Sequence, residues 1–172
     1  MNKKIDINDK IFIAGSTGMV GSAIKRLFIR NGYKNNLLLP KRKELNLLDS
    51  QLVNKWFIKN NPNIVIISAG KVGGINANNV YPANFILENL KIQTNIIESS
   101  WKCGVKRLLF LGSSCVYPKF AIQPIKEEYL LSGELESTNQ WYAVAKIAGI
   151  KLCESLRIQH NFDAISLMPT NL

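Results

Sequence analysis

Lys10-Ile-Phe-Ile-Ala-Gly-Ser-Thr-Gly-Met-Val-Gly21 is the stretch that decides the fold. Its apolar start has the length and composition of a strand buried in a parallel sheet. Gly15, Gly18 and Gly21 follow, and apolar residues then recur at helical spacing as far as Asn31-Gly32, which predicts a helix end. A strand, a glycine turn and a helix in this order favour dinucleotide binding, because a pyrophosphate can approach the glycine backbone and the N–H groups of the helix N-terminus. The alternative is a tight turn without a ligand.

The rest of the chain continues this alternation. Further strands are predicted at residues 37–39, 63–67, 107–111 and 163–167. Further helices are predicted after an N-terminal cap at Ser50, from Pro82 to about Cys103, and around Tyr142 through Leu156, with a polar loop at residues 76–81. Five strands with four intervening helices predict an α/β fold, a doubly wound parallel sheet of the Rossmann type with strand order 3-2-1-4-5. We expect one domain over residues 10–172, a flexible segment at 1–9, and an exposed edge at the fifth strand.

Charge and composition narrow the class of protein. The net charge is +10, and residues 1–60 hold 12 of the 22 basic residues but 4 of the 12 acidic ones. Such a basic half suits nucleic acid or an anionic small molecule, and the absence of interleaved aromatic residues favours the small molecule. No apolar run approaches the roughly 18 residues of a membrane span. The three cysteines lack metal-ligand spacing, so we expect no metal, a reducing compartment and hence the cytoplasm.

The basic loop Pro40-Lys-Arg-Lys43 follows the second predicted strand. NAD-binding folds usually place an acidic residue at this strand end, whereas an arginine suits the 2′-phosphate of NADP. The sequence therefore favours NADP(H), with Arg42 as the phosphate ligand because of its forked guanidinium. The alternative is a solvated basic loop.

Two clusters of reactive side chains follow later in the chain. Tyr142 and Lys146 are four residues apart, so they share one helix face, and a nearby ammonium lowers the pKa of a phenol. Gly112-Ser-Ser-Cys115 places two hydroxyls and a thiol at a strand end. The alternatives are an ordinary helix face and a capped turn with a buried free cysteine.

The glycine fingerprint, Ser113 and Tyr142-x-x-x-Lys146 occur in an order that resembles the extended short-chain dehydrogenase/reductase family. Longer blocks extend the resemblance over residues 10–172: Gly18-Met-Val-Gly-Ser22, Lys71-Val-Gly-Gly-Ile75, Leu109-Phe-Leu-Gly-Ser-Ser-Cys-Val-Tyr-Pro118, Ala145-Lys-Ile-Ala-Gly-Ile-Lys-Leu-Cys-Glu-Ser155 and Pro169-Thr-Asn-Leu172. These blocks are similar to those of the members that convert GDP-4-keto-6-deoxy-D-mannose to GDP-L-fucose.

This resemblance implies epimerisation at two carbons beside the keto group, followed by reduction of the ketone with NADPH. Cys115 would act as base or acid in the proton exchange, while Ser113 and Tyr142 would bind the carbonyl oxygen. Tyr142 would protonate that oxygen during reduction, and Lys146 would hold the nicotinamide ribose and lower the pKa of Tyr142. The residues that would contact NADP(H) are Gly15, Ser16, Thr17, Gly18, Met19, Val20, Gly21, Arg42, Lys43, Glu44, Leu45, Asn46, Leu47, Leu111, Gly112, Ser113, Ser114, Tyr142, Lys146, Pro169, Thr170, Asn171 and Leu172.

Two departures from the family pattern matter. Thr17 stands where the family's fingerprint carries an arginine, so Arg42 and its lysine neighbours would bind more of the 2′-phosphate. Family members also continue with further strands and with a substrate domain, which supplies a histidine for epimerisation. They form homodimers. We expect that domain to be absent here and interpret His160 as a surface residue. Another nucleotide-sugar epimerase or dehydratase, or a non-catalytic NADP-binding module, stays an alternative.

Overall fold

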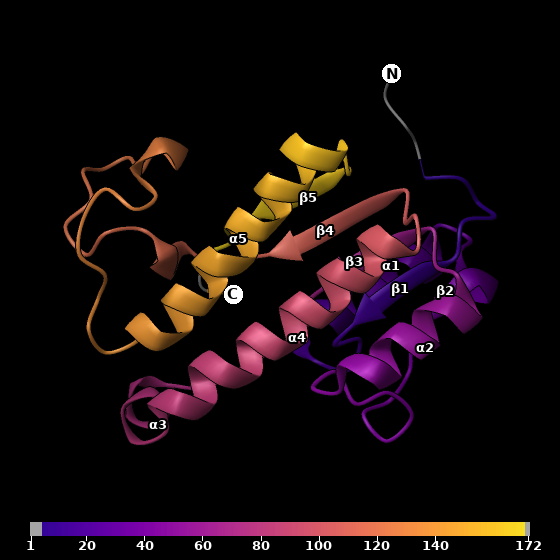
Figure 1. Ribbon diagram of the computed structural model, residues 1–172, viewed down its shortest axis with the longest axis horizontal. Helices are drawn as coiled ribbons and strands as arrows, with labels where there is room; N and C mark the ends of the chain where they lie inside the picture. The colour runs from indigo at the N-terminus through magenta and orange to yellow at the C-terminus, as the bar shows by residue number, and fades with distance from the viewer. Residues whose placement is uncertain (1–4, 171–172) are drawn as a thin grey trace.

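The parallel sheet predicted from the opening strand is present in the computed structural model, which describes residues 5–170 (Figure 1). Its five parallel strands are β1 (Ile11–Ala14), β2 (Leu37–Leu38), β3 (Ile64–Ile67), β4 (Arg107–Leu111) and β5 (Ala164–Leu167). The helices are α1 (Met19–Arg30), α2 (Ser50–Asn60), α3 (Ile75–Val80), α4 (Pro82–Lys102) and α5 (Gln140–His160), with short 3-10 helices at Lys34–Asn36, Ser114–Val116 and Glu127–Tyr129. The doubly wound α/β class is confirmed.

The strand order differs from the predicted 3-2-1-4-5. The sheet runs β2-β1-β3-β4-β5, so β3 pairs with β1 and β4 instead of lying at an edge beside β2. The reason is burial: all four residues of β3 are buried, whereas β2 has two half-buried residues and suits an edge. The chain therefore leaves β1 toward one side for β2 and returns to the other side for β3. This places the topological switch point, where open α/β sheets bind ligands, at the carboxyl ends of β1 and β3.

The two faces of the sheet are covered unequally. Helices α2, α4 and α5 lie side by side over one face (Figure 1), and their apolar side chains join Phe12, Val65 and Phe110 in the larger core cluster. On the opposite face, Ile24 and Phe28 of α1 pack against isoleucines of β1 and β3. The functional loops at the β1/β3 end therefore rest on strands that are buried from both sides.

Two local predictions were wrong. The cap of α2 is Asp49 instead of Ser50, because the Asp49 carboxylate accepts a hydrogen bond of 3.0 Å from the Leu52 backbone N–H. Residues 76–81, predicted as a polar loop, form most of α3. The buried Asn78 explains this helix, since its amide donates to the backbone oxygens of Gly73 and Gly74 one turn earlier.

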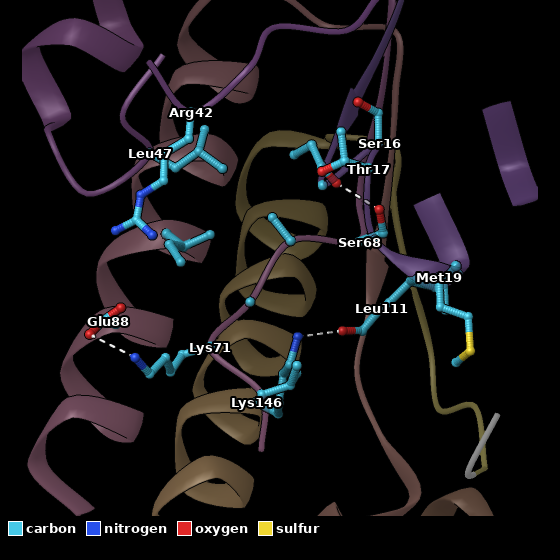
Figure 2. A pocket seen from close by; sticks show the side chains of 18 of the residues that line it. Ser16, Thr17, Met19, Arg42, Leu47, Ser68, Lys71, Glu88, Leu111 and Lys146 are labelled. Carbon is cyan, nitrogen blue, oxygen red and sulfur yellow. Dashed lines mark hydrogen bonds and ion pairs between the residues drawn. The ribbon is translucent and has the colours of Figure 1, made fainter. Parts of the chain in front are cut away.

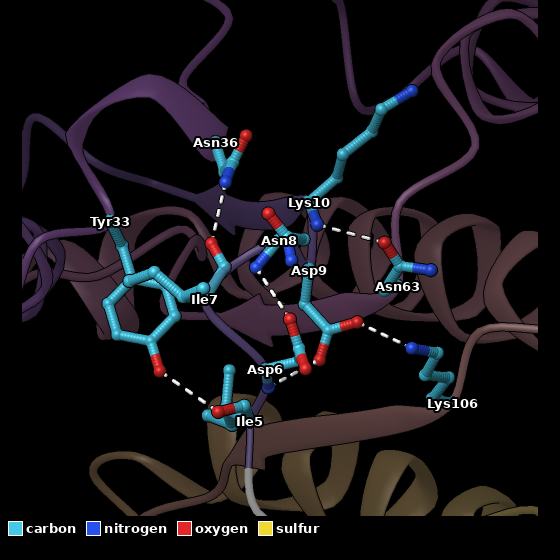
Figure 3. Close-up of polar contacts among 10 residues, drawn as sticks. All are labelled: Ile5, Asp6, Ile7, Asn8, Asp9, Lys10, Tyr33, Asn36, Asn63 and Lys106. Carbon is cyan, nitrogen blue, oxygen red and sulfur yellow. Dashed lines mark hydrogen bonds and ion pairs between the residues drawn. The ribbon is translucent and has the colours of Figure 1, made fainter.

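The segment before β1, predicted to be flexible, makes specific contacts in its described part (Figure 3). The Tyr33 hydroxyl donates to the Ile5 carbonyl at 3.0 Å, and the Asn36 amide donates to the Ile7 carbonyl at 2.6 Å. Asp9 is 4% exposed and pairs with the Lys106 ammonium at 2.5 Å. From Ile5 onward this segment is therefore held against the amino-terminal end of the sheet, and the rest of the predicted flexible segment, residues 1–4, lies outside the described residues.

Within residues 5–170, no helix combines the length and apolar character needed to cross a membrane. The same residues contain no group of three or more His, Cys, Asp or Glu side chains placed to hold a metal ion.

Candidate active site

A cavity of about 740 Å³ opens at the carboxyl ends of the strands, at the β1/β3 switch point (Figure 2). That volume is in the range of small-molecule and cofactor sites. Most of the predicted site residues line it: Gly15, Ser16, Thr17, Gly18, Met19, Val20, Arg42, Leu45, Asn46, Leu47, Leu111, Gly112, Ser113, Tyr142, Lys146, Pro169 and Thr170. Five do not form its wall, namely Gly21, Lys43, Glu44, Ser114 and Cys115. Asn171 and Leu172 lie outside the described residues.

The three glycines of the fingerprint have different roles in the turn between β1 and α1. Gly15 has a φ of 81°, and a Cβ there would lie 2.7 Å from the Ala69 backbone nitrogen. A Cβ on Gly21 would collide with the Gly15 carbonyl oxygen. Gly18 has an ordinary φ of −73°, and a Cβ there would meet nothing closer than 3.4 Å. The fold therefore explains Gly15 and Gly21, while a side chain on Gly18 would occupy space at the cavity wall.

The N-terminus of α1 forms part of the same wall. Among the described residues, no side chain caps this helix, and its first turn contains no acidic residue. By contrast, the Asp49 carboxylate caps α2. The Ser68 hydroxyl, which follows β3, donates to the Ala14 carbonyl at 2.6 Å and ties the ends of β1 and β3 together. The free N–H groups and the positive dipole end of α1 thus face the cavity, an arrangement that fits a phosphate group.

The basic loop after β2 contributes to another part of the cavity. Lys41 and Arg42 line the cavity, and Figure 2 shows the Arg42 side chain extending from this loop. Lys43 is exposed outside it. The Glu44 carboxylate accepts a hydrogen bond of 2.8 Å from the Lys41 backbone N–H, so it closes the loop on itself. Of the three cations in this loop, Lys41 and Arg42 are therefore the two that a ligand in the cavity would meet.

Lys146 is the buried cation of the site. Its side chain is fixed by a 2.7 Å hydrogen bond from Nζ to the Leu111 carbonyl, and Nζ lies 4.7 Å from the centre of the Phe110 ring (Figure 2). The residue is 5% exposed, and this burial lowers the pKa of Lys146 to about 8, against a partial opposing effect of the Cys115 charge. At neutral pH the ammonium therefore remains mostly charged.

Tyr142 lies one helical turn before Lys146, as predicted, but its ionisation differs from the prediction. Burial, with a smaller contribution from the Cys115 charge, raises the pKa of Tyr142 to about 12. The expected lowering by Lys146 does not occur, because the Lys146 ammonium is bound to the Leu111 carbonyl and lies 5.7 Å from the Tyr142 ring centre. Tyr142 is thus a protonated phenol at neutral pH, a group that can donate a proton or a hydrogen bond.

Ser113 and Cys115 come from the turn after β4. Ser113 lines the cavity, and its hydroxyl oxygen accepts from the Cys115 backbone N–H at 3.4 Å. Burial raises the pKa of the Cys115 thiol, while the hydrogen bond with Ser113 and the charge of Lys146 oppose this rise. The charge of Cys115 therefore affects the ionisation of Tyr142 and Lys146, although Cys115 is not among the residues that line the cavity.

Sequence analysis quoted the loop Lys71–Ile75 for its resemblance but assigned no site role to the Lys71 side chain or to α4. Lys71 and Glu88 both line the cavity and form an ion pair at 3.6 Å (Figure 2). The buried Asn89 accepts from the Lys71 backbone N–H and donates to the Lys71 carbonyl, each at 2.9 Å, which sets the path of this loop. A signal was available: the amides of Asn89 and Gln93 interrupt an apolar stripe at four-residue intervals on α4. His160 ends α5, is exposed, and stacks on Trp101 away from the cavity-lining residues.

These features together fit an elongated anionic ligand. The cavity contains the N-terminus of α1 and Gly18, a position where the fold itself would accept a side chain. It also contains a pair of cations, Lys41 and Arg42. Beside the ends of β4 and α5 it adds a proton donor, Tyr142, and a buried ammonium, Lys146. A dinucleotide phosphate has this distribution of charge, with a pyrophosphate at its middle and a further phosphate near one end.

Comparison with known proteins agrees with this geometry. The model of the NAD dependent epimerase/dehydratase family matches residues 11–172. GDP-L-fucose synthase 1 of Arabidopsis thaliana is 58% identical over 167 residues, 97% of this chain and 51% of that protein. GDP-L-fucose synthase of Escherichia coli is 55% identical over 163 residues, 95% of this chain and 50% of that protein. The structure of a GDP-mannoheptose C4 reductase from Campylobacter jejuni with NADP bound superposes with a TM-score of 0.94 at 42% identity, covering 98% of this chain and 53% of that one.

The chain thus spans about half the length of the relatives that it matches. The family match itself covers every strand and helix described above. The resemblance drawn from the sequence motifs is confirmed at this level: the chain belongs to the NAD dependent epimerase/dehydratase family.

Proposed function

We propose that this chain binds NADP(H) in the cavity and carries the cofactor-binding and reducing part of an enzyme that epimerises and reduces a GDP-linked 4-keto-6-deoxy sugar. The substrate that we propose is GDP-4-keto-6-deoxy-D-mannose and the product GDP-L-fucose. The observation that carries the proposal is that one cavity joins the α1 N-terminus, Arg42 and the Tyr142–Lys146 pair. The names of the relatives that are 55–58% identical support the choice of substrate.

The binding roles follow from the position of each group. The N–H groups at the start of α1 would hold the pyrophosphate, and Gly18 leaves room for its close approach. The Arg42 guanidinium would bind the 2′-phosphate through two parallel hydrogen bonds. When bound, NADPH supplies the hydride that reduces a ketone.

The residues of α5 and β4 would manage the proton of this reduction. Tyr142 holds its proton at neutral pH, so its hydroxyl would donate to the ketone oxygen as negative charge develops there. The Ser113 hydroxyl would donate a second hydrogen bond to the same oxygen. The Lys146 ammonium, fixed on the Leu111 carbonyl, would hold the nicotinamide ribose.

Cys115 would exchange the proton on carbon during epimerisation. Protons beside a carbonyl are removed more easily when donors hold the enolate oxygen, and Ser113 and Tyr142, which both line the cavity, would provide them. Burial raises the pKa of the Cys115 thiol, and the Ser113 hydrogen bond and the Lys146 charge oppose this rise, so the thiol would hold its proton until a substrate is bound.

The first test is a titration of this chain with NADPH and NADH, followed by the fluorescence of the reduced nicotinamide. We expect saturable binding with NADPH preferred. Absence of binding would overturn the proposal, and the basic surface would then have to be explained by another ligand.

The second test adds GDP-4-keto-6-deoxy-D-mannose in D₂O and follows NADPH oxidation and deuterium beside the carbonyl. Tyr142→Phe should lower hydride transfer while deuterium still enters, whereas Cys115→Ser should slow deuterium entry and leave NADPH affinity unchanged. Each loss is expected to be ~10²–10⁴-fold, as for general acid–base groups. NADPH binding without any turnover would instead support a non-catalytic binding module.

A further inference from the structure

A buried amide joins the two long helices behind the site. Gln93 of α4 is 2% exposed, and its Nε2 donates a 2.5 Å hydrogen bond to the carbonyl of Ala145. Ala145 directly precedes Lys146 on α5, and α4 and α5 run side by side over the sheet (Figure 1). The bond therefore connects α4 to the helical turn that carries Tyr142 and Lys146.

The same place is interlocked sterically. A Cβ on Gly149 would lie 2.6 Å from Phe110 Cζ and 2.9 Å from Gln93 Cδ, so α5 approaches β4 and α4 as closely as it does because residue 149 is glycine. The ring of Phe110 in turn lies under the Lys146 ammonium. A shift of α5 would thus change the surroundings of Lys146 directly.

Burying the Gln93 amide costs free energy, so good packing alone does not explain why an amide stands at this position. Among the described residues, Gln93 Oε1 has no hydrogen-bond partner although it is buried. A buried polar atom without a partner costs about 1–3 kcal/mol, which an apolar side chain of similar size would avoid. The directional bond to Ala145 is what the amide supplies and an apolar side chain cannot.

We propose that Gln93 is a positioning residue that holds α5 in the register at which the Lys146 ammonium reaches the Leu111 carbonyl and the cavity. The bond restrains rotation and sliding of α5 against α4, and Lys146 follows that helix. The importance of this helix position for catalysis rests on the proposed function. The surroundings of Lys146, however, can be followed through its titration without any cofactor.

The test compares Gln93→Met, which keeps the volume and removes the donor, with Ser100→Ala. Ser100 is a matched control because it is also fully buried on α4, but its hydroxyl donates to the Ile96 carbonyl of its own helix. The titration of Lys146 is followed by competitive acetylation between pH 6 and 11, with mass spectrometry of the peptide that contains it. Melting temperature and NADPH affinity are measured on the same variants.

In the unmutated chain, burial places the pKa of Lys146 at about 8. In Gln93→Met we expect the midpoint to rise by ~0.5–1 pH unit, because a loosened helix lets water reach the ammonium. The neighbouring titratable groups, Cys115 and Tyr142, are unchanged in this variant. The melting temperature should stay the same or rise, NADPH affinity should fall about threefold or more, and Ser100→Ala should match the unmutated midpoint.

An unchanged Lys146 midpoint in a folded Gln93→Met would overturn the inference. If that variant does not fold, Gln93→Leu serves the same purpose. Absence of NADPH binding in the unmutated chain would instead refute the proposed function and leave the titration result standing.

Discussion

The β1–β3 half of the sheet and the β4–β5 half are built differently. Every residue of β1 and β3 is buried, because helices cover both faces there. In β4 burial alternates along the strand, and in β5 the burial declines until Leu167 is 47% exposed. The sheet order also places β5 at an edge, as expected from the sequence.

This difference separates binding from chemistry. The proposed phosphate site follows β1 and β3, where backbone contacts fix the loops. The groups proposed to transfer protons follow β4 or belong to α5, where a few side-chain contacts such as the Lys146–Leu111 hydrogen bond set the geometry. We therefore expect changes in the first half to affect folding and those in the second to affect mainly the site.

The largest effect is expected from Gly21→Ala. The new Cβ would collide with the Gly15 carbonyl oxygen, so the turn between β1 and α1 would have to open. We expect a loss of about 3–5 kcal/mol in the free energy of unfolding, a large part of the stability of a domain of this size. Chemical denaturation measures it.

Gly18→Ala is the matched control for the turn. Its Cβ has room within the protein but projects at the cavity wall, so the variant should fold normally and bind NADPH at least about tenfold more weakly. Equal stability of the two variants would contradict the steric argument.

Two apolar truncations test the covering of the sheet. Ile66→Ala removes a side chain buried between β1 and β4 and should cost about 2–5 kcal/mol. Leu167→Ala removes a half-exposed side chain at the edge and should cost less than about 1 kcal/mol. If urea denaturation gave similar losses in the free energy of unfolding for the two variants, Leu167 would be packed more tightly at β5 than its exposed fraction indicates.

The same contrast explains what the sequence could predict about the fold. Uniform apolar runs such as Ile64–Ile67 and the helical periodicity of Pro82–Lys102 are local patterns, and both elements formed where they were predicted. The order of the strands, by contrast, depends on how the connecting helices pack on the sheet and which strands they bury. The position of β3 beside β1 therefore did not follow from local pattern.

For the site, the motifs predicted most of the cavity wall because the glycine turn and the Tyr142–Lys146 spacing are local. Lys71 and Glu88 were missed because they come together only when α4 lies beside the loop after β3. The direction of the Tyr142 pKa shift was wrong because it depends on which oxygen the Lys146 ammonium binds, and sequence spacing carries no information on that.

The pH dependence of stability tests the burial of Lys146. Its pKa is lowered from 10.5 to about 8 on folding, so above pH 8 the unfolded chain binds more protons and stability rises with pH. The slope contributed by one such group is at most about 1.4 kcal/mol per pH unit. Above pH 9 the raised pKa of Cys153, about 11, acts in the opposite direction, so the informative window is pH 8–9.

Lys146→Met should lack this rise. Between pH 7.5 and 9, the unmutated protein should therefore gain about 1 kcal/mol relative to the variant in urea denaturation. Lys151→Met removes a half-exposed lysine from the same helix and should give a curve parallel to that of the unmutated protein. If the free energies of unfolding of Lys146→Met and the unmutated protein differed by the same amount at every pH, the Lys146 ammonium would be solvated in the folded protein.

The basic loop of the binding half tests cofactor choice, and here the effect is on ligand preference and not on folding. Arg42 and Lys43 are neighbours in the sequence and both are exposed, but only Arg42 lines the cavity. Arg42→Ala should reduce the preference for NADPH over NADH about tenfold, equivalent to about 1.4 kcal/mol, because it removes the group proposed to bind the 2′-phosphate directly. Lys43→Ala should change the preference less than about threefold, since a charge outside the cavity acts on the ligand only through solvent that contains salt. Titrations at two salt concentrations separate the cases, because the contribution of Lys43 should vanish at high salt while that of Arg42 persists in part. Equal losses from the two substitutions would mean that the loop acts through its net charge, and the specific geometry assigned to Arg42 would be wrong.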